Sequence, residues 1–333
     1  MMLVTEEIRF FMENILNTGN LLGLDRATLM VYLAEGVRND DEPDILLHVD
    51  SYTILGGFLE ALILKMIDDA KGKSVGGVEW IIQEYKSFVE NIKDYEKKII
   101  KHTKRYYEKI NNIADLLRIL DRRVKVHLSE ISTGVELYFS GRYEIMKNHI
   151  SRKINELSAE GISDIVVTSP FEYSLYQVKY ASQISTWPFK LVFFPELIKA
   201  KLSSIKPVDV RAIIFEPYMT PVSMFSPDLR EYVLEIITRI DGLLGNIRGV
   251  KIVDKLYDGM PIGYEQLWMI NPIITVNMAR SILEKYQKDV DVFITVRTST
   301  AMMLNVTKDI YEIDTAIYDY ADFVSRILLG RGL

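Results

Sequence analysis

The sequence predicts an α/β protein of two repeated lobes, each a parallel sheet flanked by helices, with a long helical insertion in the first lobe. Three observations support this class: near-continuous Val/Ile/Phe runs, amphipathic stretches between them, and an internal repeat. Strands buried on both faces of a parallel sheet are typically unbroken apolar runs. The predicted strands cover residues 44–50, 123–128, 164–169, 189–194, 210–215, 250–254, 291–296 and 309–314.

The stretches between these runs carry apolar residues three and four positions apart, which is typical of helices packed on a sheet. They predict helices over residues 58–70, 143–159, 172–183, 229–240, 274–286 and 317–329. Residues 1–43 form a predicted N-terminal helical segment, with helices near 6–16 and 26–35.

The two halves repeat one order of elements: a helix, a strand opened by Asp164 or Asp291, a polar turn and a new helix. Any two strand–helix units look alike, but a matched order of four elements favours a true repeat. The sequence therefore predicts a first lobe over residues 44–207 and a second over 208–333.

Residues 78–122 form the insertion, in which apolar positions alternate steps of three and four from Ile81 to Leu120. One continuous helix of this length would extend about 60 Å. Two arrangements are open. The segment is either a helical pair packed on its own lobe, with Asn111 and Asn112 able to turn it, or a projecting arm that docks a partner.

The composition excludes several classes of function. The chain has 333 residues and no cysteine, so it uses no thiolate nucleophile, disulfide or cysteine-ligated iron–sulfur cluster. Net charge is −6 with interleaved signs, which disfavours nucleic acid as a partner. No apolar stretch approaches the ~20 residues of a transmembrane helix, and the acidic start is unlike a signal peptide, so we expect a cytoplasmic protein. Scarce Cys and Gln with abundant Ile, Tyr, Lys and Glu are typical of a thermophile.

Six loops that follow strands match, in order and spacing, the cysteine-bearing loops of a known family. In the second half they are Glu216 to Tyr218, Tyr257-Asp258-Gly259, and Arg297 to Thr300. In the first half they are Asp50-Ser51-Tyr52, Ser132-Thr133-Gly134, and Ser169 to Glu172. With these loops the chain resembles the cysteine-rich (CCG) domain found twice in an iron–sulfur subunit of heterodisulfide reductase, as a degenerate homologue without cysteine.

This resemblance implies a cofactor-free protein, because the residues at the loop positions cannot replace thiolates as cluster ligands. It implies a non-catalytic structural or assembly subunit of a heterodisulfide-reductase-like complex of sulfur metabolism. Its partners would be iron–sulfur and flavin proteins, with a homo-oligomer as a further possibility. No catalytic, cofactor-binding or metal-binding residue is assigned. A salt bridge from Arg297 to Asp258 or Glu216 would fill the vacated cluster cavity.

An alternative function uses the cleft between the lobes to bind a small molecule or anion, with or without catalysis. The helices that follow Arg297 to Thr300 and Ser169 to Glu172 would present free N–H groups to an anion. Acid, base and oxyanion roles would fall to Glu216, Tyr218, Tyr257, Asp258, Arg297 and Ser299. The strand residues His48 and His127 are expected in the core, or together at the same cleft. The candidate cleft positions are Asp50, Tyr52, Ser132, Thr133, Ser169, Glu172, Glu216, Tyr218, Tyr257, Asp258, Arg297 and Thr300.

Overall fold

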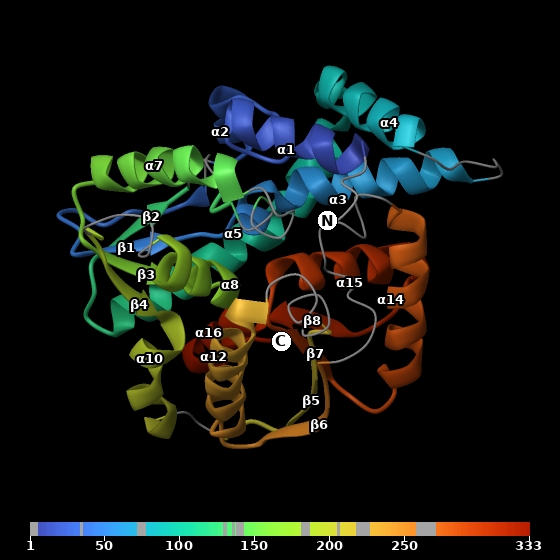
Figure 1. Cartoon of the computed structure of the whole chain (residues 1–333). Coiled ribbons are helices and arrows are strands. Elements are labelled where there is room, and N and C mark those ends of the chain that lie inside the picture. Colours follow the sequence, from blue (N-terminus) through green and yellow to red (C-terminus); the bar gives the residue numbers. More distant parts are fainter. Residues whose placement is uncertain are drawn as a thin grey trace.

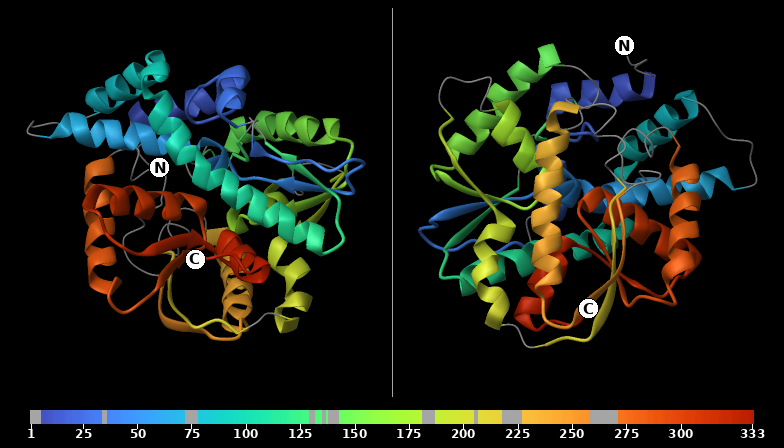
Figure 2. Two further views of the ribbon diagram at one scale, coloured as in Figure 1. Left: turned by 180° about the vertical axis from the view of Figure 1, so that it is seen from behind. Right: turned by 60° about the horizontal axis from the view of Figure 1, so that its bottom comes forward.

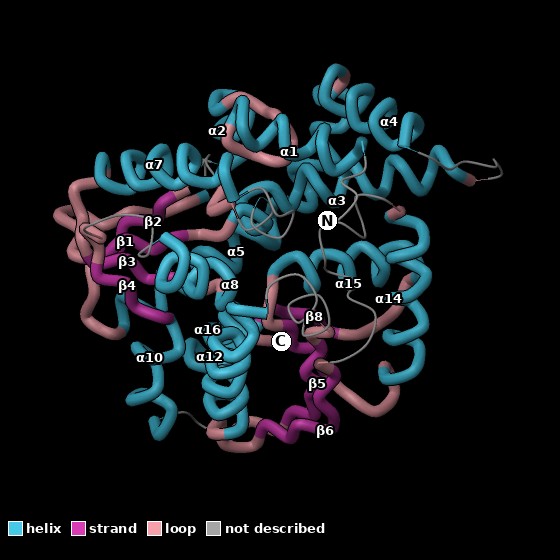
Figure 3. The backbone as a smooth tube through the Cα atoms, viewed as in Figure 1, coloured by secondary structure: helices cyan, strands magenta, loops and turns pink. Residues whose placement is uncertain are grey.

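The computed structural model contains two four-stranded sheets that form separate groups (Figures 1 and 3). All strands pair in parallel with their neighbours, so the predicted class of two parallel α/β lobes is confirmed. The structure describes residues 6–33, 36–71, 78–128, 132–134, 137, 143–180, 187–204, 207–217, 227–257 and 271–333.

The first lobe has the strand order β2-β1-β3-β4. Its strands are β1 (Ile45–His48), β2 (Val124–His127), β3 (Asp164–Val167) and β4 (Lys190–Phe193). Its other elements are α1 (Glu6–Thr18), α2 (Arg26–Leu33), α3 (Ser51–Ala70), α7 (Tyr143–Ala159), α8 (Pro170–Ser174), the π-helix η3 (Leu175–Tyr180), α10 (Phe194–Ile198) and the 3₁₀ helix η4 (Lys199–Ser204). Helix α7 lies along one face of this sheet (Figure 1).

The second lobe repeats the arrangement in the order β6-β5-β7-β8. Its strands are β5 (Val210–Phe215), β6 (Val250–Leu256), β7 (Val292–Thr295) and β8 (Ala316–Asp319). Its helices are α12 (Pro227–Gly245), α14 (Pro272–Tyr286), α15 (Thr298–Tyr311) and α16 (Tyr320–Leu329). The domain boundary predicted at 207/208 stays a prediction; it falls in the connection between η4 and β5.

The last strand lies later in the chain than its apolar pattern predicts. Helix α15 continues to Tyr311 and ends at Glu312, whose φ of 53° is in the left-handed region typical of helix C-termini. Strand β8 then pairs with β7, from Ala316 beside Val292. The predicted strand over 309–314 is therefore wrong, because pairing with a distant strand and not local composition sets this register.

The insertion forms two helices, α4 (Val78–Glu90) and α5 (Glu96–Ile119), joined by a 3₁₀ turn, η2 (Ile92–Tyr95). The turn is not at the asparagine pair: Asn112 instead donates to Asp322 of α16 at 2.6 Å, and Asn111 to the Gly36 carbonyl at 2.8 Å. Seen from behind, α5 crosses the molecule between the first lobe and α16 (Figure 2). The insertion is therefore a helical pair that packs on its own lobe, as the first of the two expected arrangements has it, and α5 in addition packs on α16 of the second lobe.

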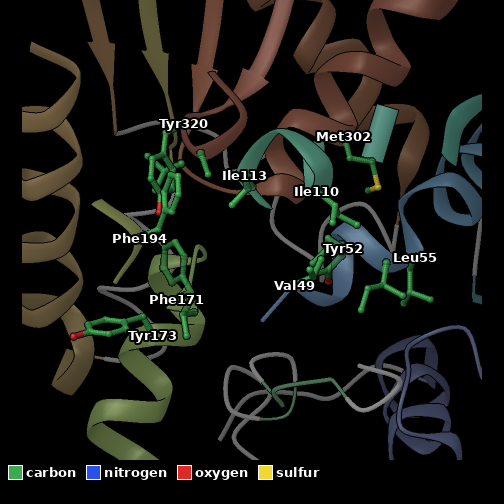
Figure 4. Packing of buried hydrophobic residues seen from close by; sticks show 14 of the residues in the cluster. Val49, Tyr52, Leu55, Ile110, Ile113, Phe171, Tyr173, Phe194, Met302 and Tyr320 are labelled. Carbon is green, nitrogen blue, oxygen red and sulfur yellow. The ribbon is translucent and has the colours of Figure 1, made fainter. Parts of the chain in front are cut away.

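One hydrophobic core continues through both lobes. Figure 4 shows part of it, with Val49 of the first lobe, Ile110 and Ile113 of α5, and Met302 and Tyr320 of the second. A second, smaller cluster lies within the second lobe between β5, β7 and α14. Among the described residues, no helix is long and apolar enough to cross a membrane.

Candidate binding site between the lobes

The carboxyl ends of strands from both sheets face one pocket, here called the inter-lobe pocket. In each sheet the first strand lies between the second and third, so successive crossovers diverge there, and α/β folds bind ligands at such points. The pocket is lined by residues 50–52, 168–169, 171–172, 296–299 and 319–321, with Thr133 and Lys109. Its volume is about 30 Å³, which is room for one or a few water molecules.

A buried lysine joins the two lobes at this pocket. Lys109, on α5, lies 2.5 Å from Asp319, the last residue of β8, and 3.4 Å from Asp50, which follows β1. Its ammonium also donates to Thr53 at 2.7 Å and to Thr298 at 2.6 Å. Thr298 in turn donates to Asp50 at 2.9 Å, so α5, α3, α15 and β8 meet in one polar network.

The network favours the charged forms of Asp50 and Lys109. Burial acts to raise the pKa of Asp50, but the Lys109 ammonium and hydrogen bonds from Thr53 and Thr298 hold it below its usual value. Burial acts to lower the pKa of Lys109, and the charges of Asp319 and Asp50 outweigh this and raise it. Lys109 is therefore a fixed cation and cannot serve as a neutral nucleophile.

Three long helices begin at the pocket, and two of them are capped by aspartate. Asp50 accepts from the Thr53 amide at the start of α3, and Asp319 accepts from the Ala321 and Asp322 amides at the start of α16. The third, α15, follows Arg297, and no described side chain caps it. Its N-terminus therefore presents the positive end of the helix dipole to the pocket, with the Glu216 carboxylate bonded to the Arg297 amide beside it.

Two side chains at the start of α15 also face this space. The hydroxyl of Ser299, a residue only 1% exposed, has no hydrogen-bond partner among the described residues. Arg297 is 6% exposed, and its guanidinium lies 4.9 Å from the ring centre of Phe171 in the opposite lobe. An unsatisfied buried hydroxyl is costly, so this wall is suited to an acceptor from a ligand.

Glu216 supports the same turn from behind the pocket. Its carboxylate accepts from the amides of Val296 and Arg297 at 3.1 and 2.8 Å, and from the Thr300 hydroxyl at 2.8 Å. Burial raises the pKa of Glu216 to about 7, although the Arg297 charge and these hydrogen bonds act to lower it. Among the contacts that the structure describes, Glu216 and Arg297 are joined by this hydrogen bond from the Arg297 backbone amide.

On the first-lobe side, Glu172 connects the pocket to a buried histidine pair. It accepts from the Thr133 hydroxyl at 3.1 Å, and its other oxygen lies 3.6 Å from Nε2 of His48. His48 and His127 are register partners on β1 and β2. Their rings are 5.9 Å apart.

The structure brings together half of the candidate cleft positions expected from the sequence. Asp50, Tyr52, Thr133, Ser169, Glu172 and Arg297 line the inter-lobe pocket. Ser132, Glu216 and Thr300 lie close by without lining it. Tyr257 is elsewhere, bonded to Asp241 of α12. Tyr218 and Asp258 lie outside the described residues.

Sequence reasoning missed Lys109 and Asp319, the two residues that complete the central network. Lys109 shares a helix face with the buried residues Tyr106 and Ile113, and a lysine within an apolar stripe was a usable signal. Asp319 was missed because the last strand was expected at 309–314, which hid its position as the residue that ends β8 and caps α16.

One other cluster among the described residues has the geometry of a metal site. Ligand atoms of Glu60, His102 and Asp309 lie within 4.8 Å of one another where α3, α5 and α15 meet. Arg105 already pairs with Asp309 at 2.9 Å and lies 3.5 Å from Glu60, which also accepts from the Tyr106 hydroxyl at 2.5 Å. These partners neutralise the carboxylates, so the cluster is a set of ion pairs that connects the three helices, here called the ion-pair brace.

Comparison with known proteins gives only distant structural likenesses. No family model and no curated protein matches the sequence. An aspartate racemase homologue from Pyrococcus horikoshii is 10% identical with a TM-score of 0.31, over 86% of this chain and 98% of that chain. A candidate Asp/Glu racemase from Yersinia pestis is 11% identical with a TM-score of 0.32, over 86% and 99%. Glutamate racemase from Francisella tularensis, in complex with D-glutamate, is 13% identical with a TM-score of 0.30, over 67% and 76%.

These findings correct the expectation drawn from the cysteine-rich family. The similar structures are racemases and a racemase homologue, and no family model supports a CCG domain. The degenerate-homologue interpretation is wrong, and so are the assembly function and the link to sulfur metabolism. The described loop positions do not surround a vacated cluster cavity: Asp50, Glu172 and Glu216 are buried and hydrogen-bonded there. The expected partner subunits and the homo-oligomer stay predictions that nothing here tests.

Proposed function

We propose that the inter-lobe pocket binds a small monoanion, with a carboxylate as its recognised group. The observation that carries this proposal is the start of α15, where a helix N-terminus without a cap from the Arg297 side chain, the buried Ser299 hydroxyl and Arg297 face one cavity. Helix N-termini attract anions through their free N–H groups and their dipole. The hydroxyl adds a donor that has no other described acceptor.

The surrounding charges favour a single negative charge. Asp50 and Asp319 lie across the pocket and Glu172 lines its first-lobe wall. The two aspartates already accept hydrogen bonds from Lys109, Thr298 and the helix amides, so their charge is held in place. These carboxylates would repel a dianion strongly at such short distances. The N-terminus of α15 is sufficient to stabilise the single charge of a monocarboxylate.

The size of the pocket limits the ligand to a few atoms unless the lobes separate. A volume of about 30 Å³ accommodates a carboxylate group and little more. The network between Asp50, Lys109 and Asp319 joins the lobes in this closed form. Binding of a larger carboxylate therefore requires opening along α5.

The test is calorimetric titration of the full chain with formate, acetate and inorganic phosphate. We expect formate or acetate to bind and phosphate to bind at least tenfold more weakly. Ser299→Ala should weaken acetate binding by about fivefold, the value of one hydrogen bond near 1 kcal/mol. Arg297→Met, which keeps a flexible side chain beside Phe171, should weaken it further.

Matched controls come from the exposed face of α14. Ser281→Ala and Arg280→Met make the same changes where the side chains only contact their own helix or Tyr311. Both should leave acetate binding unchanged. Absence of binding by either carboxylate, or equal losses in the control pair, would refute the proposed function.

A further inference from the structure

A second polar system in the first lobe leads from the inter-lobe pocket toward the surface. His48 and His127 are 1% and 4% exposed and lie at the carboxyl ends of neighbouring strands. Burying valine or isoleucine there would cost less free energy than burying an imidazole. Burying two imidazoles side by side therefore calls for an explanation beyond packing. Several of their neighbours carry charge or a titratable hydroxyl: Tyr176, Glu172, Glu156 and Glu160.

The inner end of this system is His48. Its Nε2 lies 3.2 Å from the Tyr176 hydroxyl of η3 and 3.6 Å from Glu172 of α8, which lines the pocket. Its Nδ1 has no hydrogen-bond partner among the described residues. A ring nitrogen in this state is free to gain or lose a proton without breaking another bond.

The outer end is His127. Its Nε2 lies 3.6 Å from Glu156 of α7, and its Nδ1 lies 3.0 Å from Glu160, the residue that follows α7. These carboxylates are 22% and 18% exposed, so they reach solvent. Lys125 pairs with Glu160 at 2.7 Å, and the buried Lys153 pairs with Glu156 at 2.9 Å. From solvent to the pocket the groups therefore follow one another as carboxylate, imidazole, imidazole and carboxylate, with 5.9 Å between the centres of the two rings.

We propose that His48 takes up a proton when an anion occupies the inter-lobe pocket, and that His127 with Glu156 and Glu160 exchanges this proton with solvent. The inference rests on the proposed function, because the bound anion is what drives the change. A negative charge added beside Glu172 stabilises an imidazolium at His48. The proton moves onto the ring with no other bond made or broken.

The direction in which anion affinity changes with pH follows from the pKa of His48 in the unliganded protein. Burial, then the charge of Lys153 and the neighbouring His127 ring, hold the pKa of His48 well below its usual value, and Glu156 acts to raise it. The unliganded ring therefore binds a proton less readily than a free imidazole does. A bound anion raises the His48 pKa, so affinity increases as pH falls through the interval between the free and bound values.

Glu216 could also take up a proton when an anion binds, so the experiment must distinguish uptake by Glu216 from uptake by His48. Its pKa of about 7 lies in the same range, and its turn carries Arg297, which an anion would engage. Glu216→Gln keeps an acceptor for the Val296 and Arg297 amides but cannot titrate. His102→Gln removes a buried histidine at the brace between α3, α5 and α15, away from the pocket lining, and serves as the control.

The experiment is acetate titration by calorimetry at pH 6, in two buffers of different protonation enthalpy, which counts the protons taken up. We expect uptake in the wild type, Glu216→Gln and His102→Gln, and near-zero uptake in His48→Gln. In parallel, NMR of the labelled histidine rings of the wild type should show the His48 signals moving toward imidazolium on adding acetate.

The outcomes separate the two proposals. If no carboxylate binds the wild type, the proposed function fails and this inference fails with it. If acetate binds but uptake persists in His48→Gln, or disappears in Glu216→Gln, the proton goes elsewhere and only the His48 inference is overturned. Wild-type His48 signals that stay neutral with acetate bound would overturn it even if the variant does not fold.

Discussion

At the scale of the residue, Lys109 decides how the lobes meet. Its ammonium has two buried carboxylates and two threonine hydroxyls within 3.4 Å, from α3, α15 and β8. Removing one partner of a buried ion pair leaves the other charge uncompensated, which costs more than the pair itself contributes. Asp50 and Asp319 would then lie close together as two like charges.

We therefore predict that Lys109→Met lowers the free energy of unfolding by about 3–5 kcal/mol at pH 7. The loss should be smaller at pH 4, because without the Lys109 ammonium burial acts to raise the pKa of Asp50 and its protonation removes the unpaired charge. Denaturant unfolding at the two pH values measures both. Lys104→Met on the exposed side of α5, where the lysine is 78% exposed, should change stability by less than about 0.5 kcal/mol. Equal effects at positions 109 and 104 would contradict the network.

At the scale of the element, α3 and α5 approach so closely that two glycines are required. A Cβ on Gly57 would lie 2.8 Å from the Thr103 backbone nitrogen of α5, and a Cβ on Gly56 would overlap the ring of Tyr106. Glycine normally weakens a helix interior relative to alanine. Here the close approach outweighs that preference, and it holds Lys109 against Asp50.

We predict that Gly57→Ala destabilises the protein by about 1–3 kcal/mol, because the Thr103 hydroxyl can rotate away from the new Cβ but the Thr103 backbone nitrogen and Cα cannot. Gly242→Ala in α12 is the matched change, since nothing lies within 4 Å of a Cβ there. It should instead stabilise by up to about 1 kcal/mol. Thermal unfolding of both variants gives the signs, and the same sign for both would show that the α3–α5 contact is not tight.

At the scale of the whole molecule, the two lobes are not independent units. The main hydrophobic core runs through both, and α5, encoded within the first lobe, packs on α16 of the second. Further bonds cross the same surface, such as Asn112 to Asp322 and Tyr320 to the Thr168 carbonyl. Opening of the pocket is therefore opposed by core contacts as well as by the Lys109 network.

This continuity predicts a single cooperative thermal transition for the full chain. Calorimetry should give one peak whose calorimetric and van't Hoff enthalpies agree. Acetate should raise the midpoint of that one peak, because a ligand of the folded state stabilises all that unfolds with its site. Two resolved peaks, with only one shifted by acetate, would show that the lobes unfold separately.

The sequence by itself determined the class and much of the order of elements. Apolar period and length are local properties, so they predicted the helix over 143–159 with its observed bounds, and the first seven strands within a few residues. The absence of cysteine was sufficient to exclude thiol chemistry. The cleft positions Asp50, Glu172 and Arg297 were instead predicted from the resemblance to the cysteine-rich family, and not from apolar period or length.

Only the tertiary structure decided which distant residues meet. The position of β8, the place of α5 between the lobes, and the contacts of Lys109 with Asp50 and Asp319 depend on elements far apart in the chain. Local periodicity predicts whether a side chain is buried, but it does not predict which residues pack against it. The loop pattern that resembled a cysteine-rich family was likewise a local property. Many buried hydrogen bonds of those loops join residues that are far apart in the chain, so they form only in the folded protein.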